Sequence, residues 1–165
     1  MLAGLVALAA QSVAMIGNFA FAEGTDPMDD SAWMGAMLQS DDADLVIGCE
    51  HSRAKTIYVV LKTKRSLAYT TSPLLAYLMP FEYRVDQEKS VFEPVSYGVD
   101  TVRLEGAMAR AFAERLARGS KIAVRVNGHS GPITAEFPAK GSREAIGRIA
   151  QRCGDGRLTK RLARP

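Results

Sequence analysis

The sequence contains few of the residues that most enzymes use for chemistry. It has two histidines and two cysteines among 165 residues. The H-E-x-x-H zinc motif, the G-x-S-x-G nucleophile elbow and a Gly-rich phosphate loop are all absent. If the protein were a hydrolase, its activity would depend on His51 or His129. The sequence places no acidic residue to orient either histidine. We therefore expect a protein that is not an enzyme, with no catalytic residue, no cofactor and no metal ligand.

Internal repeats are also missing, and the composition is that of an ordinary globular protein. Hydrophobic residues make up 47% of the chain and charged residues 24%. After removal of the first 22 residues, the remaining 143 are enough to form one hydrophobic core. We expect a single domain over residues 33–153.

Charge is distributed unevenly along the chain. Between Glu23 and Asp44 there are seven acidic residues and no basic one, whereas the segment after Cys153 is basic. This pattern predicts an acidic flexible arm over residues 23–32 and a basic flexible tail over residues 154–165. No arginine and aromatic motif of a known nucleic-acid reader accompanies the net charge of +3, so no nucleic-acid partner is expected.

The first 22 residues resemble a secretion signal. Residues 2–22 carry no charged side chain, and the small residues Ala20 and Ala22 fit the A-x-A site of signal peptidase. We predict a signal peptide over residues 1–22, cleavage between Ala22 and Glu23, and a periplasmic or secreted protein without a stable membrane span. A retained membrane anchor is the alternative, because the stretch is near the ~20 residues needed to cross a bilayer.

The two cysteines are predicted to form a disulfide. Strand alternation places Leu45, Ile47 and Cys49 on one face, and helical periodicity places Ile149 and Cys153 on one face. Both sulfur atoms then point into the core, and an exported chain enters a compartment where thiols oxidise. Closing a loop of about 100 residues stabilises a fold by up to ~4.7 kcal/mol.

The periodicity of the remaining sequence predicts an α+β fold. Helical patterns cover residues 106–118 and 143–153, with Ser142 as N-cap of the second helix. The last two strands form a hairpin with its turn at Asn127-Gly128. We expect a curved, sandwich-like antiparallel β-sheet with two packed α-helices and one disulfide. The predicted strands cover residues 44–50, 56–63, 81–86, 90–95, 121–126 and 133–137.

Three residues are candidates for contact with a partner. Trp33, the single tryptophan, is either an apolar plug of the core or a partner contact. Arg84 and Asp86 share a charged strand face with Glu82, either as recognition residues or as a surface charge pair.

Several of these segments together resemble a known family. They are the strand that ends in Cys49, the strand 81–86, the helix containing Phe112, the strand 121–126 and the segment that closes at Cys153. They resemble the periplasmic accessory proteins of type VI secretion, the VasI/TagO-like group. The resemblance implies a structural or recognition role for Tyr83, Arg84 and Asp86. Small invasion-associated proteins of the locus B type have a similar closing segment.

The expected function is therefore that of an exported, non-enzymatic binding or accessory protein of the bacterial cell envelope. Its partner is expected to be another envelope protein, and the sequence leaves its oligomeric state open. The alternative is a small periplasmic inhibitor of a cell-wall hydrolase. Residues 64–80 would then be the projecting inhibitory loop.

Overall fold

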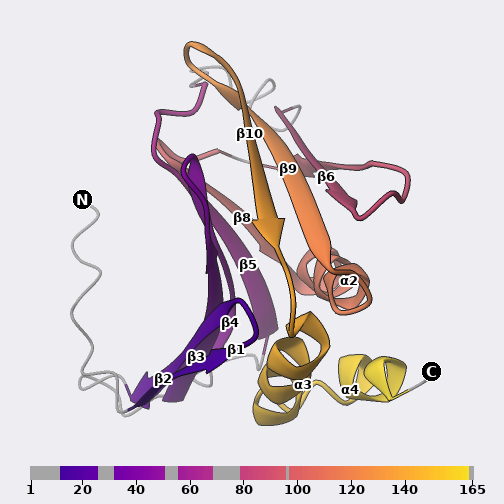
Figure 1. The fold of residues 1–165 in the computed structure, drawn as a ribbon. Helices are drawn as coiled ribbons and strands as arrows, with labels where there is room; N and C mark the ends of the chain where they lie inside the picture. Colours follow the sequence, from indigo (N-terminus) through magenta and orange to yellow (C-terminus); the bar gives the residue numbers. More distant parts are fainter. Residues whose placement is uncertain (1–11, 26–31, 51–55, 69–78, 96, 164–165) are drawn as a thin grey trace.

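The computed structural model describes residues 12–25, 32–50, 56–68, 79–95 and 97–163, and its architecture is α+β. Within these ranges, two antiparallel sheets and three helices pack around a shared core. Figure 1 shows how these elements are arranged. Sheet A has six strands in the order β1-β2-β3-β4-β5-β8, and sheet B has four in the order β10-β9-β6-β7. The predicted fold class is confirmed, but the described residues contain four further strands and a third helix, and the strands form two sheets instead of one.

Sheet A consists of the first five strands and β8. Strict alternation defines its inner face, because every second residue of β3, β4 and β5 is buried. The register places Leu45 opposite Leu61, and Cys49 opposite Ile57. The strands are β1 (Ser12–Ile16), β2 (Phe19–Thr25), β3 (Ala32–Gln39), β4 (Ala43–Glu50), β5 (Thr56–Thr63) and β8 (Thr101–Glu105).

Sheet B is built from β6 (Met79–Val85), β7 (Val91–Val95), β9 (Lys121–Gly128) and β10 (Gly131–Pro138). Its inner face again takes alternate residues, among them Phe81, Tyr83 and Phe137. The β9–β10 turn lies two residues later than predicted. Gly128 pairs with Gly131, so His129 and Ser130 form the turn.

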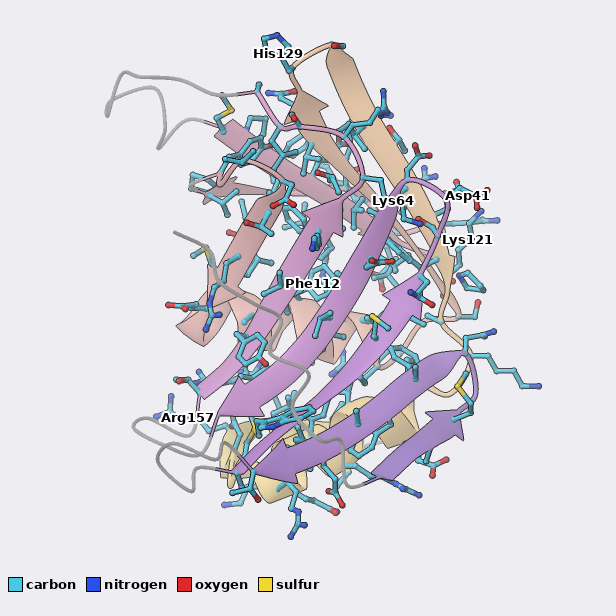
Figure 2. The ribbon with its side chains drawn as sticks, turned by 90° about the vertical axis from the view of Figure 1, so that its left-hand side faces the viewer. Asp41, Lys64, Phe112, Lys121, His129 and Arg157 are labelled. Carbon is cyan, nitrogen blue, oxygen red and sulfur yellow. A yellow bond between two sulfur atoms is a disulfide. The ribbon has the colours of Figure 1, made fainter. Side chains whose placement is uncertain are left out.

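Helix α2 (Gly106–Leu116) packs between the two sheets. It contacts β5 and β8 of sheet A. Its Phe112 ring lies 4.7 Å from the Tyr83 ring and 6.0 Å from the Phe81 ring of sheet B, between centroids. Side-chain positions are drawn in Figure 2, where Phe112 is labelled. One aromatic cluster therefore holds α2 and sheet B together.

Helices α3 (Ser142–Arg152) and α4 (Gly156–Leu162) lie beside α2 at one side of the molecule, as Figure 1 shows. The N-cap of α3 was predicted at Ser142, one residue after its actual position. Gly141 is the N-cap at φ 87°, in the left-handed region that favours glycine. The hydroxyl of Ser142 instead donates to the carbonyl oxygen of Gly119 at 3.0 Å, so this buried serine fastens α3 to the turn after α2.

The N-terminal boundaries differ from the prediction. Residues 12–22, expected in the signal peptide, form β1 and most of β2, and Glu23 to Thr25 complete β2 instead of joining a flexible arm. The turn between β1 and β2 docks on the segment before α3, because the Asn18 amide donates to the Lys140 carbonyl at 2.8 Å. The predicted cleavage point after Ala22 falls inside β2, and cleavage there stays a prediction.

The C-terminal boundary also differs. Residues 156–162 of the expected flexible tail form α4, so that prediction was wrong for this stretch. Leu158 and Leu162 are buried, and the Asp155 carboxylate caps the helix by accepting from the Leu158 amide at 3.0 Å. In the part of the chain that the structure describes, no helix has the length and apolar character needed to cross a membrane.

Candidate interaction surface

The predicted disulfide is present. Cys49 at the end of β4 and Cys153 at the end of α3 are bonded, with Cα atoms 6.1 Å apart and a sequence separation of 104 residues. Both cysteines are buried, because the two periodic patterns aim them at the same point of the core. The bond covalently attaches α3 to sheet A.

Trp33 lies in β3, at the end of sheet A near the disulfide. Its side chain is half-buried and packs against the backbone of Gly24, where a Cβ atom would stand only 2.8 Å from the ring. The indole Nε1 is buried, with no acceptor among the described residues. Trp33, Glu23 and Arg152 line a cavity of about 170 Å³, and an Arg152–Glu23 ion pair of 3.6 Å lies at its edge. The tryptophan thus belongs partly to the core and partly to a small polar-rimmed cavity.

Arg84 and Asp86, predicted to act together, have separate environments. The Asp86 carboxylate accepts hydrogen bonds from the Ser120 amide, the Ser120 hydroxyl and the Lys121 amide, at 2.9–3.1 Å. These bonds from Ser120 and Lys121 lower the pKa of Asp86. Asp86 also has a positive φ of 47°, so it shapes the turn after β6. Asp86 therefore has a structural role in this turn and forms no ion pair with Arg84 within the described residues, whereas its role in partner recognition stays a prediction.

Arg84 lies on the outer face of sheet B, which faces away from the core. Cross-strand register forms two rows on this face. The small side chain of Ala123 leaves a hollow of about 320 Å³ between the longer side chains around it. The first row is Thr134, Arg125, Glu82 and Phe92, and the second contains Glu136, Ala123 and Arg84.

The charges of the outer face are only partly neutralised. Arg125 pairs with Glu82 at 3.2 Å, and Lys121 pairs with Glu136 at 2.5 Å. Arg84 is exposed and has no ion pair within the described ranges. The guanidinium of Arg84 is therefore available to a carboxylate or carbonyl group from outside.

An exposed aromatic residue lies on the same face as Arg84, in the neighbouring cross-strand row. Phe92 is 63% exposed, although it belongs to a strand and pairs in register with Glu82. Phe92 was not among the predicted interaction residues, although the alternation of the hairpin places it on the same face as Glu82. Arginine and aromatic side chains are the types enriched at binding hot spots.

Tyr83, whose role the resemblance left open, lies on the opposite face of β6. It is 1% exposed, and burial raises the pKa of its hydroxyl group. Its ring packs against Phe81 and Phe112. This side chain is structural, because it is not accessible to a partner.

The histidines are not brought into a common site by the described part of the structure. His129 is exposed at the β9–β10 turn, and Figure 2 shows it at the opposite end of the molecule from Arg157 of α4. His51 lies outside the described residues. Among the described residues there is no group of three His, Cys, Asp or Glu side chains arranged to hold a metal ion.

The comparisons with known proteins identify a structural neighbour and no family. No family model matches the chain, and no curated protein matches its sequence. The fold is similar to the crystal structure of invasion associated protein B from Bartonella henselae. The TM-score is 0.57 at 13% sequence identity, and the match covers 88% of this chain and 99% of that chain.

At this sequence identity the match establishes a shared fold. The resemblance to locus B-type proteins is confirmed as a similarity of fold. The resemblance to type VI secretion accessory proteins has no counterpart in these comparisons and stays a prediction.

Proposed function

We propose that this chain is an exported, non-enzymatic binding protein of the bacterial cell envelope that recognises a protein partner through the outer face of sheet B. The observation that carries this proposal is the open outer face of sheet B, where Arg84 has no ion pair among the described residues and the exposed Phe92 lies in the neighbouring cross-strand row. Aromatic residues and arginine are both enriched at protein interfaces relative to the rest of the surface. The rows of paired charges around them resemble the polar rim of such an interface.

Two observations support the envelope location. The Cys49–Cys153 disulfide is buried in the core, and disulfides of this kind persist in oxidising compartments. The structural neighbour is named as invasion associated, and its fold is matched over nearly all of its length. A link to a type VI secretion system is a narrower hypothesis, which rests on the sequence resemblance alone.

Site-specific crosslinking tests the recognition surface. A photo-crosslinking amino acid replaces Phe92 in the full chain, expressed in a Gram-negative host, and the same amino acid at exposed Lys62 of sheet A serves as control. We expect a discrete adduct with an envelope protein from position 92 and none from position 62. The adduct should be lost in a chain that also carries Arg84→Glu. An adduct that persists with Arg84→Glu, or equal adducts from both positions, would contradict the proposal.

The same assay separates the alternative function, a hydrolase inhibitor acting through residues 64–80. Of that segment, residues 69–78 lie outside the described structure, and Leu67 is buried and bridged to Gly128. For an inhibitor, the chain should block a wall hydrolase regardless of Arg84→Glu. Deleting residues 69–78 should abolish that inhibition while the adduct from position 92 is retained.

A further inference from the structure

The positive charge of the chain is concentrated on its helices. Residues 106–118 and 142–163 contain nine basic and three acidic residues, a net charge of +6. The rest of the chain contains 12 basic and 15 acidic residues, a net charge of −3. We call these two segments the helical face. Because α2, α3 and α4 contact one another, the molecule is electrically polarised between its helices and its sheets.

The acidic residues of the α2–α4 contact are already neutralised. Both oxygens of Glu114 are used, by Arg118 at 2.7 Å and Arg161 at 2.6 Å. Asp155 binds Arg110 through one oxygen, also at 2.7 Å, and caps α4 with the other. An approaching anion therefore meets guanidinium groups rather than free carboxylates.

A groove of about 170 Å³ runs between α2 and α4. The short side chains of Ala107 and Ala111 lie along it, and its remaining lining residues are Arg110, Glu114, Arg157 and Arg161. Glu114 is the one acidic residue of this lining, and both of its oxygens are paired with arginines. Arg157 has no ion-pair partner within the described residues, and neither has Lys160 on the same helix. Several N–H donors of these arginines are thus free to bind phosphate oxygens, which guanidinium groups contact in pairs.

From this arrangement we propose that the helical face docks on an anionic phospholipid bilayer, with a lipid phosphate held in the groove by Arg110, Arg157 and Arg161. The positive charge extends over three helices, an area larger than the binding site of one small anion. The exposed large hydrophobic residues of the described chain are Met15, Phe92 and Val99, and none lies on these helices. Binding is therefore electrostatic and peripheral. It is independent of the proposed recognition by sheet B, which uses other residues.

Vesicle sedimentation with the oxidised full chain tests this proposal. Binding to vesicles that contain phosphatidylglycerol is expected, with none to vesicles of phosphatidylcholine alone and loss of binding at 1 M salt, where screening acts within about 3 Å. The triple variant Arg157→Ala, Lys160→Ala, Arg161→Ala should bind about 100-fold more weakly, because each basic residue near an anionic surface contributes about fivefold. Arg157→Ala alone, which removes no ion pair, should lose about fivefold.

A charge-matched control distinguishes this site from net charge. The variant Lys62→Ala, Lys89→Ala, Lys140→Ala removes the same charge from exposed positions outside the helical face and should retain its affinity. Equal loss in both triple variants would overturn the proposal, and thermal melts of each variant show that it is folded. If inorganic phosphate at constant ionic strength displaces the protein from the vesicles, the groove is a site for small anions and the bilayer proposal is refuted. Retention on duplex DNA without vesicle binding would also refute it.

Discussion

Removal of residues 1–22 should leave most of the protein molecules unfolded, because the β1–β2 hairpin is part of the core. Ile16, Phe19 and Phe21 are 5%, 0% and 6% exposed. Burial of each such side chain is worth about 1.5–3 kcal/mol, so their loss costs about 5–9 kcal/mol. The hydrogen bonds between Asn18 and Lys140 are lost as well. A whole domain of this size is stable by only about 5–15 kcal/mol.

The assay compares two oxidised chains by guanidinium unfolding, one beginning at Ser12 and one beginning at Glu23. Trp33 fluorescence and circular dichroism report the transitions. We expect a cooperative transition for the chain beginning at Ser12 and little or no folded population for the other. Equal midpoints and equal denaturant slopes would refute the reasoning, and cleavage after Ala22 would then be compatible with the fold. The N-terminus of the mature protein isolated from a Gram-negative host, read by mass spectrometry, should accordingly lie upstream of the hairpin.

Four further perturbations have expected outcomes. Reduction of the Cys49–Cys153 bond, which closes a separation of 104 residues, should destabilise the domain by about 3–5 kcal/mol, measured by unfolding with and without reductant. Asp86→Asn should cost about 1 kcal/mol at neutral pH. The pKa of Asp86 in the folded state lies below 3.8, so the difference in unfolding free energy between the wild type and this variant should persist above that pH. The difference should disappear as the pH falls through the pKa of the folded state, which urea titrations at several pH values would show. Phe112→Ala should cost about 3–5 kcal/mol in the same titrations, whereas Phe92→Ala should change stability by less than about 0.5 kcal/mol.

Much of the core was predictable from periodicity alone. Alternation identified β4, β5 and β6, and the helical repeat identified α2 and α3, because these elements bury one face and expose the other. The disulfide followed from the same patterns, since both cysteines stand at the buried phase of their elements. Here, local sequence and tertiary structure agree.

The elements that were not predicted are β1, β2, β3, β8 and α4, and some of them had a local pattern with a competing explanation. The uncharged stretch before Glu23 resembles a secretion signal, and only its pairing with β3 shows β1 and β2 as strands. Helix α4 has seven residues, too few to be stable alone, and its two buried leucines depend on α2 and α3. The site was half predictable: Arg84 was found from its strand, but the role of Asp86 depends on Ser120, 34 residues away.

The contact between the first turn and the segment before α3 also constrains the order of folding. Asn18 and Lys140 are separated by 122 residues, and Cys49 must wait for Cys153 to emerge. The inner face of sheet A therefore cannot be covered by α3 while the chain is still being synthesised from its N-terminus. Contacts between residues so far apart in the sequence also form slowly. We therefore expect the fold to be completed only after the last helices of the chain are available.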